Sequence, residues 1–489
     1  MLLHQQPAMT IRLSGSDSTF VLDEPYEPQH TLKIAVFDEQ SSKAFRFERV
    51  SEALNAAVAV LPQMRWAVQF VPLGLGHPVW ISDPAYNVRN HLRHARLPDP
   101  GTKSQLCTKI GEVASEPVPA GQPPWELWFL EGFEGNKVVA VLKMNHALAD
   151  GGTFADLLDL MTRPEPNSPP IVPSIPRAAA PARSGTALRA GTRDLLQAVR
   201  HELPPRTRTV LRAYTRAKKT LAQRPPSRFG APALPWRGPL TPPRSFSWVS
   251  VPLDEVKQIA QAISGTVNDV VFAIVARAVR QCLAEEGMLT DRPVIANTAV
   301  RTRKEGDTRL WGTAVTALPF ELPTHLSDPL ECLRAAHAQT AMVKAEAATR
   351  PVHAEDWFDF APPVLLLPAL KLTRLAARRV NGALIVSNVK GPREKRYIGG
   401  MGIENFLSCG HLKYAAGINT TIWSYDKLLN FAVYGCSRTL PDAELFTQRI
   451  QAAFDELRSA TSDLGDNRTD PPKQAQAAPS AVGGDARGC

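Results

Sequence analysis

The spacing of apolar residues along the first third of the chain predicts both strands and helices. Runs rich in β-branched and apolar residues predict strands at Thr31–Phe37, Glu126–Phe133 and Lys137–Met144. Apolar residues three and four positions apart predict helices at Glu48–Leu61 and Lys103–Ala114. This mixture indicates an α/β unit.

The second half of the chain repeats the mixture. Its predicted strands are Ser245–Pro252, Pro293–Val300, Ala314–Phe320, Leu384–Asn388, Asn419–Tyr425 and Leu429–Tyr434. Its predicted helices are Leu253–Ile263, Asp269–Glu286, Asp328–Ala347 and Asp442–Ser459. Two α/β halves commonly place a ligand site in the cleft between them.

A proline-rich segment separates the two halves. Prolines cluster between Pro164 and Pro243, where regular structure is hard to sustain. Between the clusters, the spacing at Thr192–Arg200 and Thr207–Ala222 predicts one or two basic amphipathic helices. The predicted organisation is an N-terminal lobe, a crossing linker, a C-terminal lobe and a disordered tail, at residues 1–163, 164–243, 244–461 and 462–489.

Length and composition exclude several classes of protein. The 489 residues are 44% hydrophobic and 21% charged, which is ordinary for globular chains and excludes a fibrous repeat or wholesale disorder. No apolar run approaches the roughly 18 residues of a membrane-spanning helix. The N-terminus lacks the basic and apolar regions of a secretory signal, so we expect the chain to stay in the cytoplasm.

Cysteine spacing and short motifs exclude further kinds of site. The six cysteines show no C-x-x-C pair, so we interpret them as reduced thiols and expect no metal site. The phosphate-loop, nucleophile-elbow and H-E-x-x-H motifs are all absent. Residues 171–246 carry 15 Lys and Arg against 2 acidic residues, but this basic segment has few aromatics for base stacking. We therefore expect no nucleic-acid partner.

The most informative segment is the strand that ends at Asn145 and His146. A histidine at the end of a buried strand can present an imidazole to a cleft as a general base, because its ordinary pKa lies close to neutrality. Gly151 and Gly152 permit a tight turn and close approach of a ligand, and Asp150 can hold that turn through its side chain. The alternative is a core histidine without a chemical role.

Several strings in chain order resemble one family of CoA-dependent acyltransferases, the bacterial wax ester synthase/acyl-CoA:diacylglycerol acyltransferases. The doubled-histidine motif H-H-x-x-x-D-G of this family is matched by Asn145–Gly151, with asparagine in the first position. The other strings that resemble family motifs are Leu13–Asp17 with His30, Pro124–Glu126 with Leu130–Gly132, Thr266–Val271, Ser387–Pro392 and Ile418–Tyr425.

The resemblance implies a fold and a reaction. It implies an α/β fold of two chloramphenicol-acetyltransferase-like lobes with mixed sheets, and a tunnel between them with His146 at its mouth. The implied reaction is transfer of a long-chain acyl group from acyl-CoA to diacylglycerol, and also to long-chain alcohols. Acyl-CoA is then a co-substrate, and no bound cofactor or metal is implied.

The resemblance also implies roles for individual residues. His146 would be the general base, Asp150 would order the loop, and Asn268 would face the oxyanion or the substrate. The alternative for Asn268 is a purely structural role as a helix N-cap. The residues implied in substrate binding are Asn145, Gly151, Asp269, Ser387, Asn388 and Gly391.

A lipid acceptor would place the enzyme at an interface. Residues 171–246 have a net charge of +13, and the apolar segment Pro362–Val380 also ends in basic residues. Since a basic residue near anionic lipid contributes about 1 kcal/mol, we expect peripheral binding to the inner face of the membrane or to lipid droplets. Leu365–Leu370 could instead be ordinary core.

Two other functions fit the same residues. A different acyltransferase of the superfamily would use His146 identically with another alcohol acceptor. A catalytically impaired, lipid-binding homologue would be consistent with Asn145 in place of the first motif histidine and with the basic segment. The sequence carries no indication of oligomeric state.

Overall fold

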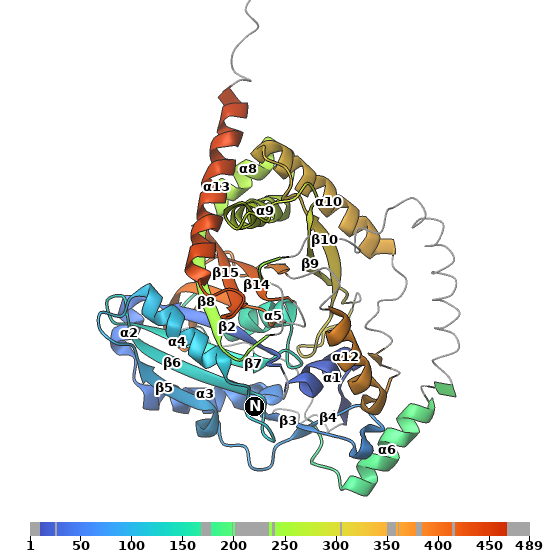
Figure 1. Cartoon of the computed structure of the whole chain (residues 1–489). Helices are drawn as coiled ribbons and strands as arrows, with labels where there is room; N and C mark the ends of the chain where they lie inside the picture. Colours follow the sequence, from blue (N-terminus) through green and yellow to red (C-terminus); the bar gives the residue numbers. More distant parts are fainter. Residues whose placement is uncertain are drawn as a thin grey trace, which may run out of the picture.

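The computed structural model gives the fold of most of the chain (Figure 1). The residues it describes are 10–24, 27–166, 168, 178–197, 199–200, 234–236, 240–303, 306–349, 358–359, 361–377, 384–412 and 416–466. The predicted helix at 207–222 and most of the predicted tail lie outside these residues. The last helix, α13 (Ala443–Asp466), runs past the predicted start of the tail at residue 462.

The N-terminal lobe is built on a six-stranded mixed sheet. Its strands follow the order β12-β13-β2-β7-β6-β5, and only β5 and β6 pair in parallel among them. The central strands are runs of apolar and β-branched residues, which are buried on both faces as such runs require. Their bounds are β2 His30–Phe37, β5 Leu92–Arg96, β6 Trp125–Phe133, β7 Lys137–Asn145, β12 Tyr397–Ile398 and β13 Met401–Cys409.

The C-terminal lobe is built on a second six-stranded mixed sheet, in the order β10-β9-β11-β14-β15-β8. The strand β11 lies parallel to both of its neighbours, β9 and β14, and the other pairs are antiparallel. The bounds are β8 Arg244–Pro252, β9 Val294–Arg301, β10 Val315–Leu322, β11 Leu384–Val389, β14 Ile418–Tyr425 and β15 Leu428–Cys436.

Helices cover the faces of both sheets and bury the apolar stripes that the sequence predicts. In the N-terminal lobe, α4 packs on one face of the sheet, and α3 and α5 contribute to the apolar core on the other. In the C-terminal lobe, α9 lies between α10 and α13, with α8 beside it (Figure 1). The bounds are α3 Phe47–Val60, α4 Lys103–Ser115, α5 Gly151–Met161, α8 Leu253–Ala262, α9 Val267–Glu285 and α10 Pro329–Thr349.

Smaller elements lie beside the N-terminal lobe. A three-stranded sheet has the order β1-β4-β3, and the helix α6 covers part of the segment predicted as a linker. The bounds of these elements are β1 Ile11–Arg12, α1 Gly15–Asp23, α2 Glu39–Ala44, η1 Pro62–Arg65, β3 Trp66–Gln69, η2 Pro72–Gly74, β4 Val79–Ser82, η3 Val88–His91, α6 Ser184–Gln197 and α12 Pro363–Ala377.

One strand connects the lobes in a way that the sequence analysis did not predict. The hairpin β12–β13 comes from the second half of the chain, yet β13 pairs with β2 from Ile403↔Phe37 to Cys409↔Leu32. The N-terminal sheet is therefore completed by residues far along the chain, and the domain boundaries above stay predictions.

Among the described residues, no single helix is long and apolar enough to span a bilayer. The sharply bent pair α8 and α9 has sufficient length and apolar composition only when the two helices are taken together.

Candidate active site

His146 lies at the end of β7, where the chain turns toward α5. The backbone N–H of His146 donates to the carbonyl of Gln29, which fixes the residue beside the start of β2. Its ring packs against Phe20 and His411, with ring centroids 4.5 and 4.7 Å away. The residue is 8% exposed, so the imidazole is nearly enclosed by these neighbours.

A threonine from the second half of the chain orients the His146 ring. The Thr313 hydroxyl donates to the His146 carbonyl at 3.3 Å, and it also lies 3.2 Å from Nδ1 of the ring. When the Thr313 hydroxyl gives its one proton to the carbonyl, Nδ1–H donates to Thr313 and Nε2 is the basic nitrogen of the ring.

Residues 312–314, the short segment before β10, are bonded to the loop that follows His146. The Gly312 N–H donates to the Leu148 carbonyl, and the Gly312 carbonyl accepts from the Asp150 N–H. The Asp150 carboxylate accepts from the Ala314 N–H at 2.7 Å and from the Thr153 N–H at 2.7 Å. Asp150 thus caps α5 and joins the two lobes at the same time.

A second carboxyl group, that of Asp17, lies on the other side of this segment. It accepts from the Thr313 N–H at 2.9 Å and from the Ser14 hydroxyl at 2.7 Å. Burial raises the pKa of Asp17 to about 7; its hydrogen bonds oppose this shift and the nearby Asp150 charge adds to it. Asp17 therefore titrates close to neutrality. It contacts Thr313, which in turn contacts His146.

Asn145, which occupies the first histidine position of the motif, is bonded on every side by the protein. Its amide nitrogen donates to the Phe20 carbonyl and to the Glu24 carboxylate, while its oxygen accepts from the Ala147 N–H. The side chain is buried. Asn145 therefore holds the turn, and its contact with substrate stays a prediction.

The structure brings three of the other predicted residues toward one place between the lobes. A Cβ on Gly151 would lie 2.9 Å from Val389 at the end of β11, so the absence of a side chain lets the motif loop approach that strand. The adjacent Asn388 donates from its amide nitrogen to Oδ1 of Asn268 at 3.2 Å. Gly151, Asn388 and Asn268 are thereby linked through β11.

Asp269 and Gly391 have structural partners in the described residues, while Ser387 lies half-buried on β11. Asp269 accepts from the Thr266 N–H in a capping box and pairs with His337 at 2.8 Å. A Cβ on Gly391 would lie only 2.3 Å from the Ser424 carbonyl, so the close approach there requires glycine. Contacts of these three residues with substrate stay predictions.

Three residues around His146 were not found by sequence reasoning about the site. Thr313 and His411 stand in no motif, so no local signal could have found them. Asp17 belongs to the L-S-x-x-D string that resembles the family opening, which is the one signal that pointed to it.

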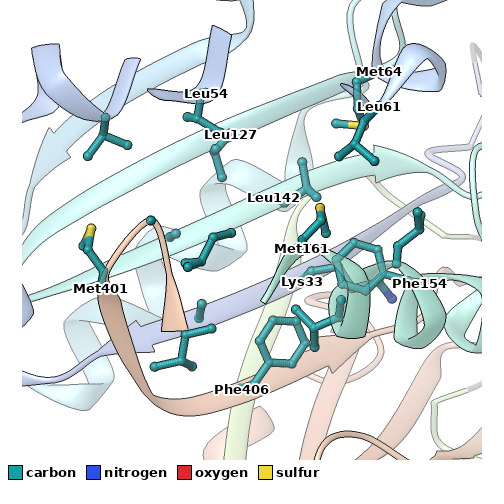
Figure 2. A pocket seen from close by; sticks show the side chains of 18 of the residues that line it. Lys33, Leu54, Leu61, Met64, Leu127, Leu142, Phe154, Met161, Met401 and Phe406 are labelled. Carbon is teal, nitrogen blue, oxygen red and sulfur yellow. The ribbon is translucent and has the colours of Figure 1, made fainter. Parts of the chain in front are cut away.

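An apolar cavity of about 550 Å³ opens beside the motif loop (Figure 2). Side chains of β2, β6, β7 and β13 form one wall, α3 and α5 form another, and Leu148 and Ala149 of the motif loop also line it. Figure 2 shows Lys33 beside Phe154 on one side of the cavity, with Leu54 and Met401 on the other. The volume is that of a typical small-molecule pocket.

The alternation of β7 explains why the cavity extends toward the end of the strand at which His146 lies. Side chains on one face of a strand are two residues apart, and Ala140, Leu142 and Met144 all line the cavity. His146 lies just beyond the end of β7 and is not part of the cavity lining. The cavity therefore lies against the N-terminal sheet and ends near the motif, and a tunnel between the lobes stays a prediction.

Metal binding is not indicated in the part of the chain that the structure describes. No group of three His, Cys, Asp or Glu side chains there could hold a metal ion. The five cysteines within it are buried free thiols, which are Cys107, Cys282, Cys332, Cys409 and Cys436.

Fold and site together define a two-lobed acyltransferase. The wax ester synthase/diacylglycerol acyltransferase catalytic domain matches residues 13–271, and the WS/DGAT C-terminal domain matches residues 311–458. The chain belongs to this family and is an acyltransferase, which confirms the resemblance on which the motif was interpreted.

Relatives match over nearly the whole chain. A Mycobacterium tuberculosis protein named for diacylglycerol O-acyltransferase activity is 29% identical over 477 residues, covering 94% of this chain and 93% of the relative. A second one from the same organism is 29% identical over 467 residues, covering 92% and 97%.

Solved structures confirm the two-lobed mixed α/β fold. The wax ester synthase/diacylglycerol acyltransferase from Marinobacter aquaeolei VT8 matches with a TM-score of 0.63 and 20% identity, covering 92% of this chain and all of that one. The first condensation domain of the calcium-dependent antibiotic synthetase matches with a TM-score of 0.58 and 14% identity, covering 93% and 97%.

Proposed function

We propose that this enzyme transfers a long-chain acyl group from acyl-CoA to diacylglycerol, with His146 as the general base. The observation that carries the proposal is the position of His146, whose ring contacts Thr313 and whose loop lines an apolar cavity through Leu148 and Ala149. An oriented imidazole supplies the proton transfer, and the cavity supplies space for a hydrocarbon chain.

The proposed chemistry needs one base and no covalent enzyme intermediate. Nε2 of His146 takes the proton of the acceptor hydroxyl while that oxygen attacks the thioester carbonyl. Collapse of the tetrahedral intermediate breaks the C–S bond, and the imidazolium returns the proton to the CoA thiolate. The products are an ester and free CoA, and the enzyme is unchanged.

Negative charge develops on the carbonyl oxygen during this attack. Because Asn268 uses Oδ1 to accept from Asn388, the remaining group of its side chain is the amide N–H₂. We assign this donor to the oxyanion or to positioning of the substrate.

The cavity favours a long acyl chain over a short one. Its walls are almost entirely aliphatic and aromatic, with Leu54, Leu127 and Phe406 among them (Figure 2). Burying each methylene contributes about 0.8 kcal/mol, so a long chain gains binding energy that a short one lacks.

The acceptor is tested by incubating purified enzyme with radiolabelled long-chain acyl-CoA and a panel of alcohols. We expect labelled triacylglycerol from diacylglycerol, a smaller amount of wax ester from long-chain alcohols, and none from short soluble alcohols. Turnover confined to soluble alcohols would overturn the proposed acceptor.

We also propose that the enzyme docks on an anionic lipid surface through one patch, named here the α6–η2–α12 surface. The helices α6 and α12 both contact η2, and they lie together on the right-hand side of Figure 1. Leu73 of η2 and Leu365 of α12 are 75% and 62% exposed. Further exposed apolar residues are Phe70, Leu196, Val199, Val364 and Leu372.

Charge on the same surface supports a lipid partner. Arg189 and Arg193 lie one turn apart on α6 and are exposed. Basic residues beside apolar side chains are typical of segments that bind anionic membrane surfaces.

The double variant Leu73→Ser/Leu365→Ser tests this surface by sedimentation with anionic vesicles. We expect at least tenfold weaker binding, because each leucine loses about 1.5–3 kcal/mol of apolar burial in the lipid. Binding of the unchanged protein should also fall as salt rises. Leu445→Ser, which removes an exposed leucine from α13, is the matched control and should bind normally. Unchanged vesicle binding by the double variant would contradict the proposed lipid-binding surface. If the unchanged protein forms a concentration-dependent dimer and the double variant does not, the α6–η2–α12 surface would instead serve self-association.

A further inference from the structure

Lys33 is a buried cation on the wall of a mostly apolar cavity, whose lining also includes Gln63 and Arg163. Lys33 is 4% exposed, and its ammonium group donates to the Ser408 hydroxyl at 2.8 Å. Its other close neighbours are the rings of Phe154 and Trp423, at 5.2 and 5.8 Å from the ring centroids. Among the residues that the structure describes, no carboxylate is in ion-pair contact with Lys33.

The other buried lysine of this sheet shows what a complete set of partners looks like. Lys143, on the opposite face, pairs with the Glu126 carboxylate at 2.9 Å and donates to the carbonyls of Val113 and Glu116. An ammonium ion uses three donors and needs a counter-charge when it is removed from water. Lys33 has one donor bonded to a neutral hydroxyl, and no carboxylate among the described residues is in ion-pair contact with it.

Lys33 carries its charge at neutral pH in spite of this burial. Loss of hydration lowers the pKa of Lys33 to about 8. The titratable groups that face it are Cys409 on β13 and Asp150 in the motif loop. Burial raises the pKa of Cys409 far above neutrality, and the Asp150 carboxylate is already bonded to two backbone N–H groups. Cys409 is therefore uncharged at neutral pH, and the Asp150 charge acts on Lys33 without ion-pair contact.

The distribution of polar and apolar groups indicates the class of ligand. Lys33 and Phe154 lie at one side of the cavity and Leu54 and Met401 at the other (Figure 2), where Arg163 and Tyr397 also belong to the lining. We propose that the cavity binds a long-chain fatty acid as its carboxylate, with the head group on Lys33 and the hydrocarbon tail between the N-terminal sheet and α3.

This site has a consequence for catalysis, which rests on the proposed function. The same cavity is proposed to take the acyl chain of acyl-CoA, and its lining includes Leu148 and Ala149, next to His146. A bound fatty acid then excludes the donor chain. Free fatty acid is expected to raise the apparent KM for acyl-CoA without lowering kcat.

Binding is tested directly by equilibrium dialysis with radiolabelled hexadecanoate, below the concentration at which it forms micelles. Saturation at one molecule per chain is expected. Lys33→Met keeps the length and apolar character of the side chain and removes the charge, so it should weaken hexadecanoate binding about 10- to 100-fold. Hexadecanol, which has the same tail and no charge, should bind both proteins equally.

Two controls separate this effect from changes in folding or in overall charge. Lys257→Met removes an exposed lysine from α8 and should leave hexadecanoate binding unchanged. The melting temperature of Lys33→Met should be no lower than that of the unchanged protein, because an apolar side chain replaces a poorly paired buried charge.

The pH dependence provides an independent readout. Below pH 8 the Lys33 amine is protonated, and above pH 8 it loses its charge, so hexadecanoate affinity should fall by up to tenfold per pH unit above that value. Hexadecanol affinity should stay constant over the same range, as should binding of either ligand to Lys33→Met.

Several outcomes would overturn the proposal. Equal affinity for hexadecanoate and hexadecanol, or equal hexadecanoate binding by the Lys33→Met variant, would remove Lys33 from the site. Saturable, Lys33-dependent binding together with no acyl transfer on any acceptor would uphold the fatty-acid site and reject the proposed function instead.

Discussion

Replacement of His146 by alanine is expected to lower the rate of acyl transfer by about 10²–10⁴-fold, which is the usual contribution of a general base. The reason is that alanine has no group to accept the proton that the imidazole beside Thr313 is proposed to take. The measurement is kcat with radiolabelled acyl-CoA and the best acceptor. Circular dichroism and thermal melting should show an intact fold, because the strand β7 keeps its buried apolar residues.

The matched control for this variant is His94→Ala. His94 is an exposed histidine on β5, and its loss should leave kcat within about twofold of the unchanged enzyme. Activity of His146→Ala within a few-fold of the unchanged enzyme would reject the general-base assignment. Loss of activity in both variants would show that the assay reports folding and not catalysis.

Replacement of Asp150 by alanine is expected to lower the free energy of unfolding by about 3 kcal/mol. The substitution removes the acceptor for two N–H groups, those of Thr153 and Ala314, and each unsatisfied group costs about 1–3 kcal/mol when buried. The measurement is urea unfolding followed by circular dichroism. Activity should also fall at temperatures where the variant is folded, because residues 312–314 are then less firmly held beside His146.

Two further variants make this result specific. Asp150→Asn keeps an oxygen that can accept one of the two hydrogen bonds, so it should lose less stability than the alanine variant. Asp159→Ala removes a mostly exposed acid from the same helix, α5, and should cost less than about 1 kcal/mol. Equal stability of Asp150→Ala and the unchanged protein would contradict the part that Asp150 plays in joining the lobes.

Local sequence determined most of the secondary structure. The predicted strands Thr31–Phe37 and Lys137–Met144 are β2 and β7 to within one residue at each end, since continuous apolar and β-branched runs suit a sheet covered on both faces. The predicted helix Glu48–Leu61 is α3, shifted by one residue, because its apolar stripe has the helical period. The motif of His146 and Asp150 could also be identified from the sequence alone, because its residues are close together in the chain.

Tertiary structure alone decided what surrounds those elements. The strand β13 joins β2 of the other half because the exposed edge of β2 needs a hydrogen-bonding partner, and no local period in residues 401–409 specifies which strand that is. Backbone hydrogen bonds between the two lobes place Thr313 beside His146, and they join segments that lie more than a hundred residues apart in the chain. The sequence shows that Lys33 is a basic residue, but only the structure shows that it is buried beneath α5 beside Ser408 without a carboxylate in ion-pair contact. The reason is that electrostatic pairing depends on distance in the folded protein and not on separation along the chain.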